Sequence, residues 1–275
     1  MPAVGPDPLA GLVARVRAGD PAALEALVGE IRDDVYNLAL RMLWHPADAE
    51  DATQEALVKV ITGLGSFRGE AAFRTWVHRV AANHLLTTRR RRMEQAAMSF
   101  EEFGEDLAAG LDVPAPDDPL LEEEVKVGCT HAMLLCLDRE QRLAYVLGEV
   151  FGLGSEDAAW VAGVSPAAYR QRLSRARARV RGFMEGHCGL VDPSNACRCS
   201  RRVGVALATG RVDPRELLFA GRAGVRSEVA DMERLHAAAA LLRSHPRYAA
   251  PGRVAEEVLR IVRSGRSGML GGAGS

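Results

Sequence analysis

The chain has 275 residues, in which 35 lysines and arginines are almost balanced by 36 aspartates and glutamates, and 48% of its residues are hydrophobic. This length is sufficient for one large domain or two to three small ones, each with a core. No stretch of about 20 apolar residues could span a bilayer, and the N-terminal MPAVGPDPLAGLVARV lacks the basic start and apolar run of a signal peptide. We therefore expect a cytoplasmic globular protein with reduced cysteines and no membrane insertion.

The net charge of −1 hides an uneven distribution of charge along the chain. Residues 67–92 contain seven arginines and one acid, and residues 165–181 contain six arginines and no acid. Between them, residues 100–125 contain ten acids and no lysine or arginine. A block of one sign is commonly a solvated face. Two basic blocks on either side of an acidic segment favour a protein that contacts a polyanion at two separate points, with a flexible acidic linker over residues 96–122.

The first part of the chain predicts three helices. Residues 20–43 open with Asp-Pro, a good N-cap and first-turn pair, and apolar residues then recur every three or four positions. Residues 48–61 predict a second helix with acids in its first turns, as the helix dipole prefers. A glycine-containing loop over residues 63–69 precedes a third helix, expected over residues 71–90.

The second part predicts helices over residues 123–137 and 139–151, followed by a helix-turn-helix. Ser155 caps a short helix, Gly163 supplies a left-handed turn residue, and Ser165-Pro166 begins a longer helix rich in arginine. Farther on, residues 228–244 and 254–264 also have helical patterns, and the final SGMLGGAGS is expected to be disordered. No strand pattern persists, so the predicted fold class is all-α.

The motifs of several enzyme classes are absent from the sequence. There is no glycine-rich phosphate loop, no Gly-x-Ser-x-Gly and no His-Glu-x-x-His. Carboxylates are plentiful in the acidic segment, but a flexible tract cannot hold a pair of them in working geometry. We therefore expect no enzymatic activity and no catalytic residues.

Two stretches resemble a known family. DAEDATQEALVKV and FRGEAAFRTWVHRVAANHLLTTRRRR are similar to region 2 of a small sigma-70 family sigma factor of the extracytoplasmic-function type, and LDREQRLAYVLGEVFGLGSEDAAWVAGVSPAAYRQRLSRARARV is similar to region 4. The resemblance implies region 2 over residues 10–95, region 4 over residues 123–185, and a Cys-bearing helical extension over residues 186–275. It also implies the partners: core RNA polymerase, promoter DNA and, as a candidate, an anti-sigma factor.

The resemblance assigns roles to residues of region 2. An acidic helical face would dock on the clamp helices of the largest polymerase subunit: Asp48, Glu50, Asp51, Gln54 and Glu55. The loop Ser66, Phe67, Arg68, Gly69 and Glu70 would capture a flipped base of the −10 element, because aromatic and arginine side chains on a glycine-bearing backbone suit stacking. The single strand would contact Arg74, His78, Arg79, Asn83, Arg89, Arg90, Arg91 and Arg92. Trp76 is interpreted mainly as a core residue.

In region 4, Ser165 and the turns after it would enter the major groove of the −35 element. The candidates for base contacts are Tyr169, Arg170, Gln171 and Arg172, since arginine reads guanine and glutamine reads adenine. Arg175, Arg177 and Arg179 would contact phosphates, which position the protein without specifying sequence. Tyr169 stands where the family commonly has valine, so the promoter sequence cannot be transferred from the family.

Three of the five cysteines and a histidine lie within HCGLVDPSNACRC, residues 187–199. No cofactor is required by the predicted function, but His187, Cys188, Cys197 and Cys199 are candidate ligands for zinc or another thiophilic metal. Cys129, His131 and Cys136 could complete such a site. Redox sensing by the thiols and simple packing of reduced cysteines are the alternatives.

The sequence leaves rival functions open beside the sigma factor. One is a stand-alone metal- or redox-responsive DNA-binding regulator that uses the helix-turn-helix alone. Another is a decoy that binds polymerase but no promoter. Intramolecular clamping of regions 2 and 4 by the helical tail after Gly210 is a hypothesis about regulation.

Overall fold

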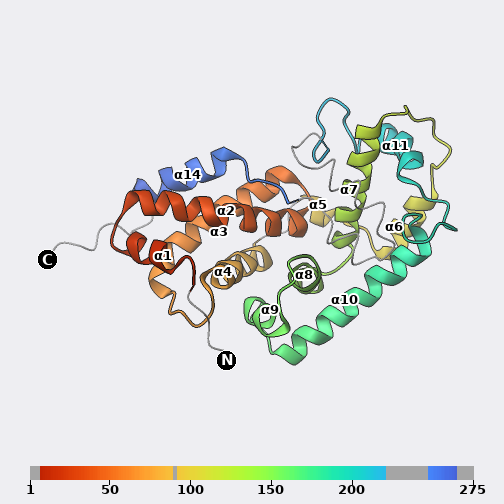
Figure 1. Cartoon of the computed structure of the whole chain (residues 1–275). Helices are drawn as coiled ribbons and strands as arrows, with labels where there is room; N and C mark the ends of the chain where they lie inside the picture. The colour runs from red at the N-terminus through yellow and green to blue at the C-terminus, as the bar shows by residue number, and fades with distance from the viewer. Residues whose placement is uncertain (1–6, 89–91, 221–246, 265–275) are drawn as a thin grey trace.

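The computed structural model describes residues 7–88, 92–220 and 247–264, and those parts are built of helices (Figure 1). The helices are α1 (Ala10–Arg17), α2 (Pro21–Leu43), α3 (Pro46–Thr62), α4 (Phe73–Thr87), α5 (Arg92–Gln95), α6 (Phe100–Ala108), α7 (Pro119–Leu135), α8 (Arg139–Tyr145), α9 (Ser155–Ala162), α10 (Pro166–His187), α11 (Cys199–Ala208) and α14 (Gly252–Arg263). A 3₁₀ turn, η1 (Leu64–Ser66), and a π-helical turn, η2 (Val146–Val150), complete them. Strand-type pairing in the described residues is confined to one isolated bridge, and the all-α prediction is confirmed.

Helices α1 to α4 form an N-terminal bundle. The carboxylate of Asp20 caps α2 by accepting hydrogen bonds from two backbone amides of the first turn, at 2.9 and 3.2 Å. Leu27, Val28 and Ile31 on α2 are fully buried, as their helical spacing predicts. Helix α4 is shorter than expected, and residues 89–91 lie outside the described part of the chain.

The segment expected to be a flexible linker contains a docked helix. Ser99 and Glu102 form a reciprocal capping box at the start of α6. Phe100 and Phe103 are buried on it, and the Phe103 ring stacks on Phe183 of α10 with ring centroids 5.4 Å apart. Residues 100–108 of the predicted linker thus form an amphipathic helix, with its three glutamates exposed and Asp106 paired with Arg202 and Arg211.

Helices α7 to α10 form a second bundle that contains the expected helix-turn-helix. Helix α9 ends at Gly163, whose φ of +66° is readily adopted by glycine. Ser165 then caps α10, accepting a hydrogen bond from the amide of Ala168 at 3.2 Å. The helix predicted over residues 139–151 forms in two parts, α8 and the π-helical turn η2.

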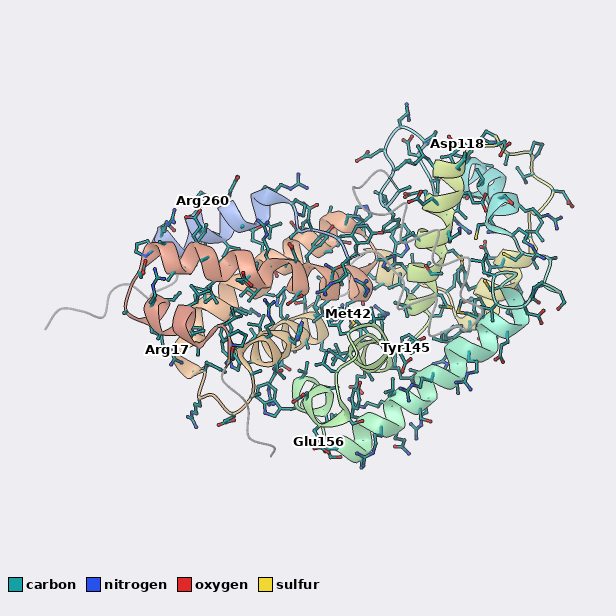
Figure 2. All side chains as sticks on the ribbon, viewed as in Figure 1. Arg17, Met42, Asp118, Tyr145, Glu156 and Arg260 are labelled. Atoms are coloured by element: carbon teal, nitrogen blue, oxygen red, sulfur yellow. The ribbon has the colours of Figure 1, made fainter. Side chains whose placement is uncertain are left out.

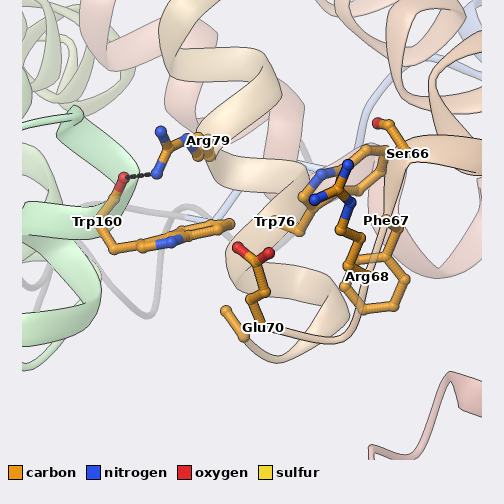
Figure 3. Close-up of a pocket in the computed structure, with 8 residues that line it drawn as sticks. Ser66, Phe67, Arg68, Glu70, Trp76, Arg79 and Trp160 are labelled. Atoms are coloured by element: carbon orange, nitrogen blue, oxygen red, sulfur yellow. Dashed lines mark hydrogen bonds between the residues drawn. The ribbon is translucent and has the colours of Figure 1, made fainter. Parts of the chain in front are cut away.

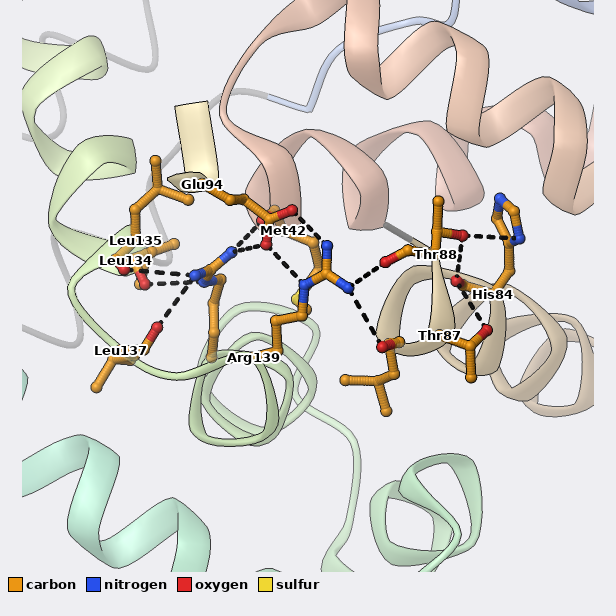
Figure 4. Close-up of polar contacts among 11 residues, drawn as sticks. Met42, His84, Thr87, Thr88, Glu94, Leu134, Leu135, Leu137 and Arg139 are labelled. Atoms are coloured by element: carbon orange, nitrogen blue, oxygen red, sulfur yellow. Dashed lines mark hydrogen bonds and ion pairs between the residues drawn. The ribbon is translucent and has the colours of Figure 1, made fainter. Parts of the chain in front are cut away.

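The two bundles pack directly on one another. Helix α4 contacts α9, and both lie beside α8 (Figure 1). A buried charged cluster joins them: Glu94 of α5 accepts from Arg139 at 2.8 and 2.5 Å and from Arg142 at 3.0 Å (Figure 4). The same arginines donate to backbone carbonyls of both bundles, including those of Thr88 and Leu134. The carboxylate of Glu94 is thus paired with two arginines, and both arginines also donate to backbone carbonyls, as buried charges require.

The C-terminal part of the chain adds two described helices. Helix α11 packs against α7, and α14 lies along α2 and α3 (Figure 1). Arg260 is on the outer side of α14, where its side chain is 64% exposed (Figure 2). The helix predicted over residues 254–264 is observed as α14, whereas the one predicted over residues 228–244 lies outside the described residues.

Candidate nucleic-acid and polymerase interfaces

A cavity of about 370 Å³ opens at the loop between α3 and α4 (Figure 3). It is lined by Ser66, Phe67, Arg68, Glu70, Ala71, Trp76, Arg79 and Trp160. The loop predicted to capture a base therefore borders a cavity with aromatic walls, two arginines and a carboxylate. Aromatic faces stack on bases, and the charged groups can hydrogen-bond to a base edge.

An aromatic cluster holds this loop in place. The ring of Phe67 lies edge-on to Phe73 at 5.2 Å and close to Trp76 at 5.5 Å between centroids. Arg17 of α1 donates to the carbonyls of Leu64 and Phe67 at 2.8 and 2.5 Å. Trp76 packs in this cluster and also lines the cavity, so it serves both as a core residue and as part of the cavity wall.

The second bundle supplies one wall of the cavity. Arg79 of α4 donates to the carbonyl of Trp160 on α9 at 2.8 Å, and its guanidinium lies over the indole ring, 4.5 Å from the centroid. This is a cation–π contact. Sequence reasoning missed Trp160 because it belongs to the other bundle, 81 residues away along the chain.

The remaining candidates on α4 differ in their surroundings. Asn83 is exposed, as a nucleic-acid contact requires, but Arg74 is half-buried and paired with Asp34 at 2.5 Å. His78 is buried, its ring lies 5.4 Å from that of Phe151, and burial lowers its pKa. The prediction that His78 contacts DNA is therefore wrong for this arrangement, because its ring packs between the bundles. Arg89, Arg90 and Arg91 lie outside the described residues, as does the side chain of Arg92.

The acidic face of α3 is divided among different partners. Asp48 lies in the first turn of α3, where the helix dipole favours a carboxylate, and Asp51 is exposed. Glu55 points toward α4, with its carboxylate 3.0 Å from Nε2 of His84. Glu50 is 8% exposed and paired with Arg253 of α14, and Gln54 hydrogen-bonds to Glu257 of the same helix. Glu50 and Gln54 thus contact α14, and Asp51 lines the groove between α3 and α14.

On α10, the structure separates exposed from buried candidates. Ser165, Arg170, Gln171 and Arg175 are exposed along the first turns. Tyr169 is fully buried, and its hydroxyl donates to the carbonyl of Ala144 at 2.9 Å. Burial also raises the pKa of Tyr169 to about 12. The prediction that Tyr169 reads a base is wrong: its ring fills the space between α8 and α10, as an aliphatic residue would.

Three other arginines of α10 bond within the second bundle. Arg172 pairs with Glu140 at 2.8 Å, and the Nε of Arg177 donates to Glu149 at 2.6 Å. Arg179 donates to Gln141 at 3.2 Å and lies over the ring of Phe100. Arg179 is exposed and bonds to an uncharged amide, so it can turn toward a phosphate at little cost. Arg177 is also exposed, but its partner Glu149 is buried, so opening that pair would leave a buried carboxylate without its cation.

The residues that lie near the cysteines of residues 187–199 differ from those predicted. Cys188 and Cys197 face one another across the isolated parallel bridge, and Cys199 follows at the start of α11, which packs on α7. Cys129 lies on α7, the helix against which α11 packs, so four of the cysteines belong to neighbouring elements. The exposed ring of His187 packs 4.8 Å from that of Phe183, and its role as a ligand stays a prediction.

Burial raises the pKa of four of the thiols, those of Cys129, Cys136, Cys197 and Cys199. Burial, and then the charges of the neighbouring cysteines, hold the pKa of Cys129 well above its ordinary value, and burial raises the pKa of Cys199 to about 12. Cys136 lies apart, and burial raises its pKa to about 11. All five cysteines are free of disulfides, and within the described ranges no three His, Cys, Asp or Glu side chains are arranged to hold a metal ion.

Comparison with known proteins accounts for both bundles. Residues 27–95 match the family Sigma-70 region 2, and residues 128–180 match Sigma-70, region 4. The chain is 34% identical over 174 residues to an RNA polymerase sigma-H factor of Pseudomonas aeruginosa, an alignment that covers 62% of this chain and 90% of the relative. The chain belongs to the sigma-70 family. It therefore acts with core RNA polymerase at promoter DNA, and the stand-alone regulator is not favoured.

A second sequence relative and a solved structure were also found. An ECF RNA polymerase sigma-E factor of Escherichia coli K12 is 32% identical over 175 residues, which cover 62% of this chain and 90% of that one. A solved structure of the sigma factor RpoE with the anti-sigma factor NepR, from Bartonella quintana, covers 58% of this chain and 95% of that chain with 19% identity and a TM-score of 0.41. The matched sigma regions end at residue 180, so α11 and α14 lie beyond them. Among the described helices, none is long and apolar enough to cross a bilayer.

Proposed function

We propose that this sigma factor directs core RNA polymerase to promoters by three separate surfaces of its two bundles. The acidic face of α3 binds polymerase, the cavity between α3 and α4 captures a base of the −10 element, and the start of α10 enters the major groove of the −35 element. The observation that carries the proposal is the pairing of the two sigma regions, in family order, with an aromatic cavity on one and an arginine-rich helix-turn-helix on the other.

For the −10 element, the cavity supplies what a flipped base requires. Phe67 and Trp76 offer aromatic faces, and Arg68 and Glu70 offer a charged donor and acceptor. Extruding a base has an unstacking cost of a few kcal/mol, which stacking and hydrogen bonds in a preformed site offset. Capture in this cavity would thereby assist melting of the duplex.

For the −35 element, the exposed side chains on the first turns of α10 are Arg170 and Gln171. An arginine that bonds to guanine, or a glutamine that bonds to adenine, contributes about 1–3 kcal/mol of discrimination. Arg175 and Arg177 lie farther along the exposed side, where a phosphate contact positions the helix.

The packing of the bundles bears on how the free protein meets DNA. Trp160 of region 4 closes one side of the −10 cavity, and Arg79 is engaged with it. A DNA strand entering the cavity must displace α9. We therefore expect the free chain to bind promoter DNA weakly and specific binding to depend on polymerase.

Run-off transcription on the promoter of its own gene tests the proposal. Core polymerase with the full chain should produce a specific transcript, and polymerase alone should not. Asp51→Arg reverses the charge of an exposed docking residue and should abolish the transcript. Glu216→Arg reverses the charge of an exposed residue after α11, outside the matched sigma regions, and should leave the transcript unchanged. Polymerase binding without any transcript on a panel of promoters would instead identify a decoy.

We also propose that Cys129, Cys188, Cys197 and Cys199 bind zinc or another thiophilic ion. The support is that Cys188 and Cys197 pair across the isolated bridge, that Cys199 and Cys129 lie on the contacting helices α11 and α7, and that zinc prefers thiolate ligands. Binding would draw the thiols together, displace their protons and fasten residues 188–199 to α7. Metal analysis of the purified protein should find one ion per chain, and chelation should lower its Tm. No bound metal, with an unchanged Tm for Cys197→Ser, would leave packing as the role of the thiols.

We also propose where the protein acts and that it is not an enzyme. The chain acts in the cytoplasm, has no catalytic activity of its own, and supplies specificity to the polymerase. An anti-sigma factor is a candidate partner that would act by occupying one of the three surfaces. Co-purification of the full chain from its source would identify such a partner.

A further inference from the structure

Helix α14 covers the face that α2 and α3 turn away from the rest of the N-terminal bundle (Figure 1). Its apolar side chains form one row: Val254, Val258, Leu259 and Val262 are all buried. An isolated helix of this length is marginal in water. Its stability therefore comes from the apolar contacts that this row makes with α2 and α3.

The residues before α14 are fixed to α2 in a defined register. The buried side-chain amide of Asn37 accepts from the Tyr248 amide at 2.9 Å and donates to the Tyr248 carbonyl at 2.7 Å. Asp33 accepts from the Ala250 amide at 2.9 Å. Because these bonds satisfy backbone groups, they would form with an extended segment at this place and do not depend on its side chains.

Charge complementarity aligns the helix along this face. Arg247 pairs with Asp34 at 2.6 Å, and the Nε of Arg253 donates to Glu50 at 2.7 Å. At the far end, Arg263 lies 3.5 Å from Glu25. The arginines are largely exposed, so each pair contributes little to affinity; together they set the orientation of the helix.

The contact of α14 overlaps the predicted polymerase-docking residues. A groove of about 510 Å³ between α3 and α14 is lined by Glu50, Asp51 and Gln54 on one side and by Arg253, Glu257 and Arg260 on the other, among others. Glu50 is covered and paired, and Gln54 is bonded to Glu257. A partner helix that required these side chains could not reach them while α14 is in place.

We propose that α14 and core polymerase compete for this α2–α3 face, so that α14 must leave before the sigma factor docks. The inference rests on the proposed docking role of α3. The surface selects an amphipathic helical partner with an aliphatic row and flanking basic groups. Helix α14 meets that description within the chain, and the competing partner in the complex is the pair of clamp helices that the resemblance assigns to this face. An occupied face lowers the apparent affinity in proportion to the fraction of molecules in which it is free.

The test compares full-length variants by titration with core polymerase. Val258→Asp places a carboxylate at a fully buried point of the α14 contact and should release the helix. The control, Ser264→Asp, places the same group at the exposed end of α14. We expect Val258→Asp to bind polymerase more tightly than wild type, within the range of about 5- to 150-fold typical of coupled equilibria, and Ser264→Asp to bind as wild type does.

Hydrogen exchange on the wild-type holoenzyme gives a second measurement that does not depend on a variant. Formation of the complex should speed amide exchange over residues 252–263 and slow it over residues 46–62. Equal affinity of Val258→Asp and wild type, or α14 that stays protected in the holoenzyme, would overturn the competition. If no variant binds polymerase, or if Asp51→Arg binds as tightly as wild type, the docking role itself has failed.

Discussion

Replacement of Glu94 by alanine tests whether the buried charged cluster holds the two bundles together. The carboxylate of Glu94 is 2% exposed and accepts three hydrogen bonds from Arg139 and Arg142. The guanidinium of Arg142 is itself only 4% exposed. The substitution therefore removes the carboxylate that pairs with buried Arg142 and half-buried Arg139.

The expected loss of unfolding free energy depends on the hydrogen bonds that the two arginines keep. Removing one partner of a buried pair commonly costs about 3–5 kcal/mol, because the other charge stays buried and unpaired. Arg142 keeps the carbonyls of Leu134 and Leu137, both at 3.0 Å, so we expect the lower end of that range. About 3 kcal/mol corresponds to a decrease in Tm of about 6–12 °C for a protein of this size.

Thermal denaturation of the full chain measures the effect. Asp213→Ala is the matched control: it also removes a carboxylate that pairs with an arginine, but at a site where Arg215 is 89% exposed, and its Tm should equal that of wild type. Glu94→Ala and Arg139→Ala should be non-additive in the double variant, because each breaks the same pair. If Glu94→Ala lowers the Tm by less than about 2 °C, the reasoning from burial and pairing is refuted.

Three further predictions concern single side chains. Burial lowers the pKa of His131 to about 3, below its unfolded value of 6.5. The stabilisation from the neutral ring is therefore present above pH 6.5 and is lost as the pH falls. The free energy of unfolding should decrease by about 2 kcal/mol between pH 7 and pH 5. Denaturant titrations at both pH values should show a smaller loss for His131→Phe, and an equal loss would contradict this. Tyr169→Phe should lower the free energy of unfolding by about 1 kcal/mol through the lost bond to Ala144, with unchanged −35 preference in transcription; an altered preference would restore Tyr169 as a base contact. Arg79→Ala removes the contact with Trp160 and should speed amide exchange over α9 several-fold, corresponding to about 1 kcal/mol, whereas unchanged exchange would mean that this contact does not hold α9.

Local patterns in the sequence predict the helices, and the resemblance of two stretches to a known family predicts the sigma regions. Helices α2, α3 and α14 appear within two residues of their predicted starts, because amphipathic spacing, Asp-Pro caps and glycine or proline breaks act over neighbouring residues. The exposed arginines of α10 follow from the same logic, since charges on several sides of one helix cannot all be buried. The loop at Phe67 was predicted to border the site, and it lines the cavity.

Contacts between distant segments could not be predicted in this way. Tyr169 and His78 occupy positions on helices where exposure and burial depend on a second bundle, and only the packed structure shows them buried. Trp160 reaches the cavity from 81 residues away, and Tyr248 bonds to Asn37 across 211 residues. Hydrophobic periodicity determined which residues of each helix face inward. Which helices meet there, and therefore that α14 covers the acidic face of α3, was decided by the tertiary structure, because complementary surfaces remote in sequence leave no periodic signal in either segment.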